Sequence, residues 1–256
     1  MVAPTFYVLR HRFCFLGDYQ DNSVMNPFAL YDDLISQIPL EAVVHEAICN
    51  NTAYVAADTG VGIAAALGAF QPPTLAGIPL REVAHLAKSW DLAKASLGVA
   101  ALNAYFNQIP AKSTASVFDT AASSLEGKKV VMVGHFPNAV EKLRQICALT
   151  VLERSPRPGD LPDSACEYVM PQAEVALITA MTLANKTMPR LLQLSNQART
   201  YLIGPSLPCA PKVFAGKANV LAGSAVVDAK WIREQVKQGK PVSKLKPALA
   251  AFEMEL

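Results

Sequence analysis

Two short segments in the second half of the sequence combine residue types that could hold a ligand. An apolar run at residues 130–133 stops at Gly134 and is followed by His-Phe-Pro. About 19 positions after the glycine, a second apolar run ends in Glu153. In nucleotide-type α/β units, a glycine turn and a carboxylate at this offset place a backbone anion site beside an acceptor for ribose hydroxyls. These segments predict a ligand cleft without specifying the ligand.

The turn after residues 130–133 has features of an anion site at the start of a helix. Gly134 lets a ligand approach the backbone closely, and Pro137 suits the first position of a helix. We expect Gly134, Phe136 and Pro137 to contact a cofactor, with the free amide groups that follow directed at it. Because only one glycine is present, an ordinary tight turn between a strand and a helix is the alternative.

His135 and Glu153 are the titratable residues at the ends of these two runs. The imidazole of His135 changes charge near neutrality and suits a general acid or base, with a partly buried packing residue as the alternative. The carboxylate of Glu153 suits hydrogen bonds from two vicinal hydroxyls of a cofactor. A salt bridge from Glu153 to Arg154 or Arg157 is the structural alternative.

A polar run that starts at Thr179 is too polar for a core and too uncharged for an open surface. Thr179, Thr182 and Asn185 supply neutral donors and acceptors, and Thr187 suits the cap of the helix that follows. We expect the three threonines to bind the cofactor. The alternative is that all of these residues cap helices or turns.

A fourth loop follows the strand predicted over Thr200–Ile203 and contains Gly204 and Ser206 between two prolines. A catalytic serine usually needs an adjacent base, and no G-x-S-x-G elbow is present. We therefore expect Gly204 and Ser206 to bind the cofactor, or Ser206 to cap a short helix, rather than to supply a nucleophile.

One stripe of the helix predicted over residues 92–107 is small, polar and uncharged, and consists of Ser96, Ala100, Asn103 and Asn107. A solvated face usually carries Lys and Glu, and a core does not tolerate two asparagines without partners. We expect the stripe to line a polar ligand cleft. Ser96 and Asn107 would contact the substrate, and Asn103 would lie near the glycine turns described above.

The pattern of apolar residues divides the chain into an extension at residues 1–26 and two parts at residues 27–110 and 111–256. The first part predicts an antiparallel meander with helices, and the second alternates apolar strands with helices, which indicates a parallel sheet covered on both faces. The predicted strands are Ala42–Ile48, Thr52–Ala57, Gly62–Leu67, Val130–Val133, Thr150–Leu152, Val175–Thr179, Thr200–Ile203 and Asn219–Ala222, and the predicted helices are Pro27–Ile38, Leu80–Trp90, Leu92–Asn107, Pro137–Ala148, Thr187–Leu194 and Ala229–Gln238.

Composition excludes several classes of protein. With 52% hydrophobic and 17% charged residues, the chain can bury a large core. The net charge of +2 and the absence of Lys/Arg runs argue against a nucleic acid or an anionic membrane as partner. The five scattered cysteines suit a reducing, cytoplasmic location. CxxC, HxxxH and HExxH spacings are absent, so we expect no tightly bound structural metal.

Taken together, several segments resemble the family named "Putative heavy-metal chelation", in family order over residues 27–230. These segments are SLGVAALNA at residues 96–104, VGHFP at 133–137, LER at 152–154, GDLP at 159–162, TAMTLANKT at 179–187 and GPS at 204–206. The resemblance implies an α/β protein: a small α+β domain like the N-terminal domain of enolase, then a Rossmann-like domain with a mainly parallel sheet. It also implies a ligand site between the two.

Two functional readings lead. The first is a small-molecule-binding protein or enzyme that handles a metal chelate in the interdomain cleft, as the family label suggests. The second is an enzyme that uses a nucleoside-containing cofactor, S-adenosylmethionine or a dinucleotide, on a small polar substrate. Its catalytic residues would be His135, Asn103 and Asn185, with transferase- or lyase-like chemistry. A fold that has lost its ligand is the third class. The expected partner is a small molecule. The sequence does not decide whether the protein forms a homodimer.

Overall fold

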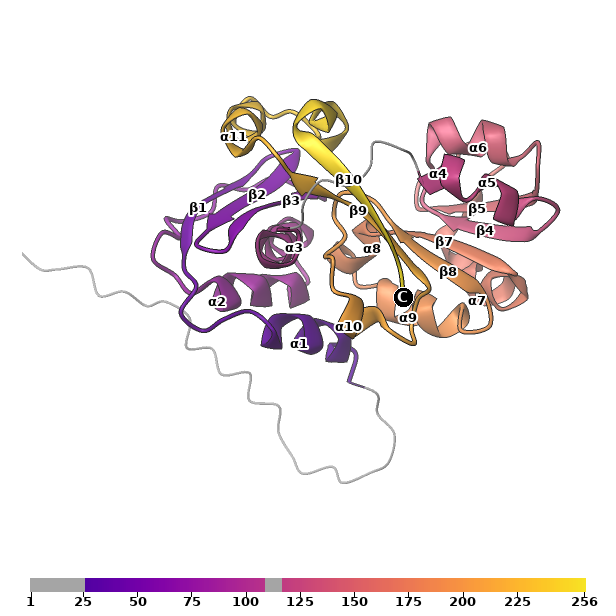
Figure 1. Cartoon of the computed structure of the whole chain (residues 1–256), viewed down its shortest axis with the longest axis horizontal. Helices are drawn as coiled ribbons and strands as arrows, with labels where there is room; N and C mark the ends of the chain where they lie inside the picture. Colours follow the sequence, from indigo (N-terminus) through magenta and orange to yellow (C-terminus); the bar gives the residue numbers. More distant parts are fainter. Residues whose placement is uncertain (1–25, 109–116) are drawn as a thin grey trace, which may run out of the picture.

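The computed structural model describes residues 26–108 and 117–256 (Figure 1). Residues 1–25 of the expected extension, and residues 109–116 around the expected boundary between the two parts, lie outside the described residues. The chain is an α/β protein in which a three-stranded antiparallel sheet with helices precedes a seven-stranded, mostly parallel sheet with helices. The predicted fold class is confirmed.

The smaller sheet is the predicted meander. Strands β1 (Val44–Cys49), β2 (Thr52–Ala57) and β3 (Gly60–Ala65) pair in the order β1-β2-β3, with both pairs antiparallel. Helix α1 (Ala29–Ser36) precedes the sheet and lies beside α2 (Leu80–Ala84) (Figure 1).

Helix α3 (Leu92–Phe106) packs against the smaller sheet and is buried along most of its length. The helix predicted over Leu80–Trp90 divides into α2 (Leu80–Ala84) and the 3₁₀ turn η1 (His85–Lys88). Gly98 explains how closely α3 and η1 approach, because a Cβ there would lie 1.9 Å from the backbone nitrogen of Ala87. Gly62 does the same on the sheet side, where a Cβ would lie 2.1 Å from the carbonyl oxygen of Ala100.

The larger sheet has the strand order β10-β9-β8-β7-β4-β5-β6, and only the β9–β10 pair is antiparallel. Its strands are β4 (Lys129–Val133), β5 (Ala148–Glu153), β6 (Leu161–Pro162), β7 (Val175–Thr179), β8 (Arg199–Ile203), β9 (Val220–Val226) and β10 (Leu249–Glu255). The chain runs outward from β4 through β5 and β6, then returns to start again at β7 on the other side of β4. This is the doubly wound order, and its switch point lies between β4 and β7.

Helices cover both faces of the larger sheet, as the apolar strands predict (Figure 1). Along β4, Val131 and Val133 face the core shared with the smaller sheet, whereas Val130 and Met132 face a second core. The helical elements are α4 (Val117–Thr120), α5 (Ala122–Leu125), α6 (Pro137–Leu143), η2 (Asp163–Ala165), α7 (Cys166–Val169), η3 (Met170–Gln172), α8 (Met181–Ala184), α9 (Met188–Leu194) and α10 (Pro211–Phe214). No helix in the described ranges is long and apolar enough to cross a membrane.

After β9 the chain returns to the smaller sheet before it ends in β10. Helix α11 (Ala229–Lys237) and the turns η4 (Val242–Lys244) and η5 (Lys246–Ala248) share an apolar cluster with Tyr54 and Ile63. Polar contacts reinforce the packing, since Thr52 Oγ1 donates to the carbonyl oxygen of Lys240 at 2.9 Å. Strands of the smaller sheet and the C-terminal segment at residues 229–248 therefore build the joint between the two sheets together.

Candidate functional site at the strand switch point

The ends of β4 and β7 touch at the switch point of the larger sheet. Gly134 has a φ of +90°, and a Cβ there would lie 2.9 Å from Cγ2 of Thr179. Glycine is required at this turn both for its backbone conformation and for the closeness of Thr179. In doubly wound sheets, ligands bind outside the carboxyl ends of the strands at this point.

Two cavities open on either side of this contact and share Phe136, Thr179 and Met181 in their walls. The larger, which we call the groove, has a volume of about 1330 Å³. The smaller, which we call the side chamber, has a volume of about 520 Å³. Each is within or above the size range of small-molecule sites.

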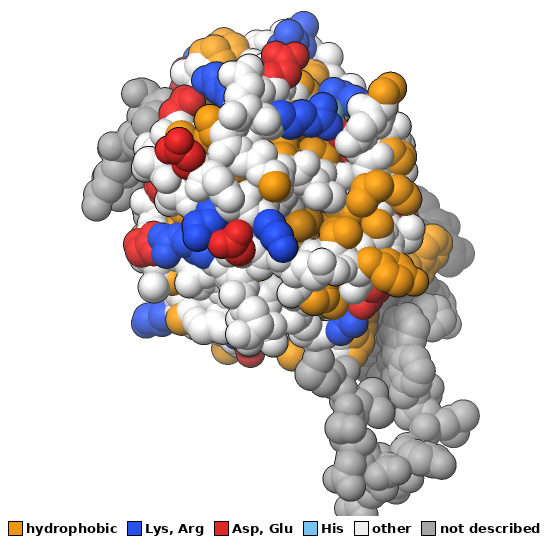
Figure 2. Space-filling view, turned by 90° about the vertical axis from the view of Figure 1, so that its right-hand side faces the viewer, with side chains coloured by type: hydrophobic (Ala, Val, Ile, Leu, Met, Phe, Trp, Pro, Cys, Tyr) orange, Lys and Arg blue, Asp and Glu red, His pale blue; other side chains and the backbone are white. Residues whose placement is uncertain are grey.

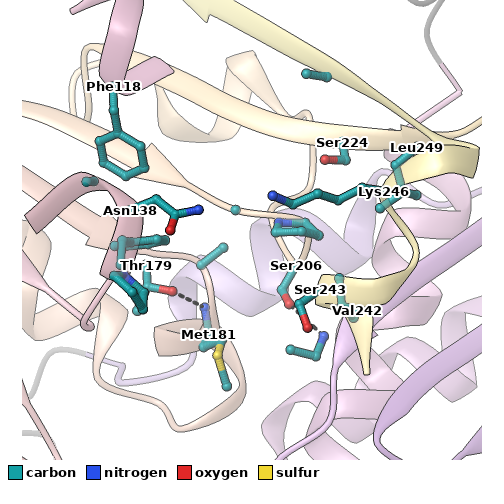
Figure 3. A pocket seen from close by; sticks show the side chains of 18 of the residues that line it. Phe118, Asn138, Thr179, Met181, Ser206, Ser224, Val242, Ser243, Lys246 and Leu249 are labelled. Carbon is teal, nitrogen blue, oxygen red and sulfur yellow. Dashed lines mark hydrogen bonds between the residues drawn. The ribbon is translucent and has the colours of Figure 1, made fainter. Parts of the chain in front are cut away.

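The groove lies between the two sheets (Figure 3). Its walls come from β3, from the loops after β4, β7 and β8, and from the C-terminal segment of η4, η5 and β10. Lys246 reaches across it toward the side of Asn138 (Figure 3) and has no ion-pair partner among the described residues. A second lining lysine, Lys142, is paired with Asp119 at 3.1 Å, and Asp119 is the only carboxylate that the described part of the chain contributes to the lining.

On the outer face beyond α4–α6, basic and acidic side chains lie side by side rather than forming a field of one sign (Figure 2). An ion pair between Lys142 and Asp119 joins α6 to α4. Among the described residues that line the groove, the one charged side chain without an ion-pair partner is that of Lys246.

Glu153, at the end of β5, directs its carboxylate back at the glycine turn. Oε2 accepts the backbone N–H of His135 at 2.9 Å, and Oε1 accepts those of Arg154 at 2.7 Å and Ser155 at 3.4 Å. The predicted proximity of the glycine turn and this carboxylate is present. The salt-bridge alternative does not describe Glu153, because its contacts are backbone N–H groups; Arg154 instead approaches Asp163 at 3.9 Å.

His135 lies in the wall of the side chamber with both its backbone and its ring held. Its Nδ1 lies 2.8 Å from Oδ2 of Asp160, whose side chain is fully buried. The same carboxylate receives the backbone N–H of Arg157 at 3.2 Å and lies 3.5 Å from the guanidinium of Arg144. Asp160 is the residue of this site that we did not single out from the sequence, although it stands within the GDLP segment.

The run from Thr179 to Thr187 lines the side chamber, but several of its polar side chains form hydrogen bonds with other residues of the same run. The hydroxyl of Thr182 donates to the carbonyl oxygen of Thr179 at 2.6 Å. Oδ1 of Asn185 accepts from both the N–H and the hydroxyl of Thr187, at 3.1 and 2.7 Å. Thr187 is the N-cap residue of α9, as predicted, but its hydroxyl donates to Asn185 and makes no capping hydrogen bond to the helix.

The polar stripe of α3 is placed away from both cavities. Ser96, Asn103 and Asn107 are at most 4% exposed and line neither the groove nor the side chamber. They bond backbone groups instead: Ser96 accepts from the N–H of Leu67, and Asn103 donates to the carbonyl of Pro205 at 3.3 Å. The expected contact between Asn103 and the 204–206 loop is therefore present. The side-chain amide of Asn103 bonds this loop of the larger sheet and does not point into either cavity.

Asn103 and Asn107 differ in how completely their side chains are bonded. Asn107 donates to the carbonyls of Leu207 and Ser224 and accepts the N–H of Cys209. Asn103 donates to Ile63 and Pro205, but its buried Oδ1 has no hydrogen-bond partner among the described residues.

Ser206 and the turn before α6 complete the predicted set. Ser206 lines the groove, and its hydroxyl accepts the N–H of Ala65 in β3 at 2.9 Å (Figure 3), so it joins the two sheets. Pro137 begins α6 as predicted, but the N–H groups of the next turn donate to the carbonyl of Phe136, which leaves few free amides for an anion. The helix ends at Leu143 rather than Ala148 because the chain must turn there to enter β5.

Comparisons with known proteins place the chain in a family. Family models described as "Putative heavy-metal chelation" match residues 31–106 and residues 116–253. The chain belongs to this family. A crystal structure of a family protein with unknown function from Desulfitobacterium hafniense DCB-2 is 33% identical, with a TM-score of 0.82, and the match covers 90% of this chain and 98% of that one.

Two further relatives extend this picture. A family protein with unknown function from Pyrococcus horikoshii shares the fold at 18% identity, with a TM-score of 0.77 and coverage of 91% of this chain and 100% of that one. An uncharacterized protein of Methanocaldococcus jannaschii is 29% identical over 161 residues, which are 58% of this chain. That match spans 61% of the relative's length, less than two thirds of it.

The family description implies a metal, and the side chains described here do not fit direct ligation. No group of three or more His, Cys, Asp or Glu residues that could hold a metal ion occurs within residues 26–108 and 117–256. In the side chamber, Nδ1 of His135 contacts Asp160 and Glu153 accepts backbone N–H groups, so Nε2 of His135 is the one ring nitrogen left open there by the described residues, fewer than the three or more protein ligands of a metal site. Burial raises the pKa of the Cys166 thiol, which disfavours the thiolate that binds metals.

Proposed function

We propose that the protein binds a small anionic organic molecule, of the class that chelates metal ions, in the groove between its two sheets. The observation that carries the proposal is the groove itself, which lies at the switch point and, among the described residues, carries one ammonium without an ion-pair partner, that of Lys246. Neutral hydrogen-bonding side chains also line the groove, namely Asn138, Thr179, Ser206, Ser224 and Ser243.

A chelate suits this lining better than a bare cation does. A chelator brings its own metal ligands, usually carboxylates, so the protein needs to supply only a positive charge and hydrogen bonds. The groove offers these groups, and the one carboxylate among its described lining residues, Asp119, is already paired with Lys142. This reading reconciles the family description with the absence of a cluster of ligating side chains in the described ranges.

A nucleoside-containing cofactor is the second candidate, and the doubly wound strand order favours it. Glu153 narrows the choice of cofactor. Because its carboxylate already accepts the N–H of His135, a negative charge occupies the place beside the glycine turn where a pyrophosphate would bind. S-adenosylmethionine has no phosphate and carries a positive sulfonium, so this candidate is compatible with Glu153 where a dinucleotide is not.

The decisive experiment is calorimetric titration at low ionic strength with citrate, nickel citrate, nickel chloride and S-adenosylmethionine. The proposal expects citrate or its nickel complex to bind and nickel chloride not to bind. Binding of S-adenosylmethionine alone would favour the second candidate. If only nickel chloride bound, the proposal would be wrong.

A matched pair of lysine substitutions locates the site. Lys246→Gln should weaken citrate binding by about fivefold, since an exposed ion pair contributes about 1 kcal/mol at most. Lys230→Gln, which removes an exposed lysine of α11 outside the groove, should leave the affinity unchanged. Equal affinities for the two variants would place the anion elsewhere.

A further inference from the structure

The side chamber contains a histidine–carboxylate pair with the geometry of a proton-transfer site. His135 and Asp160 meet through Nδ1 at 2.8 Å, and their side chains are 11% and 0% exposed. A buried carboxylate on Nδ1 holds a neutral imidazole in the tautomer that carries its proton there. The lone pair of Nε2 then remains available on a ring that lines the chamber.

A second histidine–aspartate pair, His45 with Asp58, has the same contact distance but is much more exposed to solvent. His45 contacts Asp58 at 2.8 Å through Nε2, and both side chains are about half exposed, at 57% and 47%. That pair lies on an open edge of the smaller sheet, whereas His135 lies in the wall of a cavity. The exposed His45–Asp58 pair therefore serves as a control for experiments on the His135–Asp160 pair.

Contacts from two other segments fix His135 in place. The carboxylate of Glu153 holds its backbone N–H, and Asp160, from the loop between β5 and β6, holds its ring. No partner of Nε2 occurs among the described residues. The other titratable groups around the chamber and the pair are Glu153, Arg154, Asp163, Cys166, Arg144 and Arg157.

We propose that the side chamber is a proton-transfer site in which His135 is the general base and Asp160 its positioning residue. Nε2 takes a proton from an O–H or an activated C–H of the bound molecule, and the electron pair of that bond stays on the molecule. The imidazolium that forms is stabilised by Asp160 and returns the same proton to another atom of the molecule or to water.

The chamber also indicates the class of molecule. Oδ1 of Asn185 accepts from Thr187, so its Nδ2 is the donor left for a ligand, and Asn185 lines the chamber with His135. A donor beside a base suits a carbonyl or hydroxyl compound, on which negative charge develops as the proton leaves. This inference goes beyond the proposed function, because it concerns the side chamber and does not depend on Lys246.

The test needs no knowledge of the natural ligand. Long-range proton–nitrogen NMR of histidine-labelled protein at mildly alkaline pH should show His135 with its proton on Nδ1 and a bare Nε2. Diethyl pyrocarbonate, which acylates unprotonated imidazole nitrogens, should modify His135 at Nε2, as peptide mass spectrometry would show. A merely structural pair would leave Nε2 occluded and unreactive.

Substitutions then assign the role of Asp160. Asp160→Asn should slow the acylation of His135 about tenfold or more, because the tautomer with its proton on Nε2 is no longer disfavoured. Asp58→Asn should alter only His45. The proposal is overturned if wild-type His135 carries its proton on Nε2, or if it stays unmodified after His45 and His85 have reacted. Failure of the groove to bind citrate would leave these readouts unchanged, so the two proposals fail separately.

Discussion

The carboxylate of Glu153 accepts the backbone N–H of His135 at 2.9 Å, which joins the end of β5 to the turn after β4. The other oxygen accepts the N–H groups of Arg154 and Ser155. A charged acceptor that receives three backbone donors is a structural part of the turn, and it occupies the site that an anionic ligand would need. The first prediction follows from this arrangement.

Glu153→Gln should lower the free energy of unfolding by about 1–3 kcal/mol, because the amide accepts at one atom only. Urea denaturation measures the loss, and Glu126→Gln, at an exposed position after α5, serves as the control. In Glu153→Ala the turn amide is freed, so millimolar phosphate should raise the melting temperature of this variant but not that of the wild type. A phosphate effect of equal size in both proteins would show that Glu153 does not fill an anion site.

Gly134→Ala tests the contact between β4 and β7. The new methyl group would meet Cγ2 of Thr179 at 2.9 Å, in a backbone conformation that L-residues rarely adopt. We expect a loss of about 1–3 kcal/mol in unfolding free energy. Combining it with Thr179→Ser, which removes the clashing methyl and keeps the hydroxyl, should recover part of the loss. No recovery in the double variant would assign the whole effect to the backbone.

Much of the fold could be predicted because its central strands are continuous apolar runs between helices. β4 and β7 were recognised in this way. Because the two strands are parallel, their carboxyl ends lie on the same side of the sheet. Strand β10 (Leu249–Glu255) is not among the predicted strands, and it lies at the edge of the sheet, where it pairs with β9 alone. Its pairing partner, β9, is separated from it by α11, and short-range patterns do not show such pairing.

The candidate site was predictable where residues are linked by local spacing. The offset between Gly134 and Glu153 correctly placed them together, but the choice between ligand and backbone as partner depends on the direction of the carboxylate. Asp160 reaches His135 from the loop after β5, and Lys246 reaches the groove from the C-terminal segment. Only the tertiary structure makes those contacts, so neither residue stood out in the sequence.

The asparagines of α3 give a graded test of the joint between the sheets. Asn107→Leu removes three hydrogen bonds, whereas Asn103→Leu removes two and also removes an acceptor that has no partner among the described residues. Both should lower the unfolding free energy by about 1–3 kcal/mol or more, with the larger loss in Asn107→Leu. Urea denaturation of the two variants decides the order, and a stable Asn103→Leu protein with impaired citrate binding would instead support a role in ligand binding.

Lys186 is the residue through which pH should act on stability. It has a φ of +71°, and burial lowers its pKa to about 8. In the unfolded chain its pKa is about 10.4, so between these two values the unfolded state binds more protons than the folded state does. The contribution of Lys186 to stability therefore rises as the pH increases from about 8 to about 10.4, and its charge is unfavourable below that window.

Replacing Lys186 separates the charge from the backbone conformation. Lys186→Gly removes both the buried charge and the left-handed strain, so it should stabilise the protein at neutral pH by about 1 kcal/mol or more. Lys186→Ala removes the charge and keeps the strain, so it should fall between the glycine variant and the wild type. The stability of each variant is compared with that of the wild type by urea denaturation from neutral pH to pH 10, which cancels the titration of other groups such as the Cys49 thiol. The advantage of the variants should shrink across this window because wild-type Lys186 becomes neutral in the folded state. An advantage that stays constant with pH would show that the ammonium of Lys186 is solvated rather than buried.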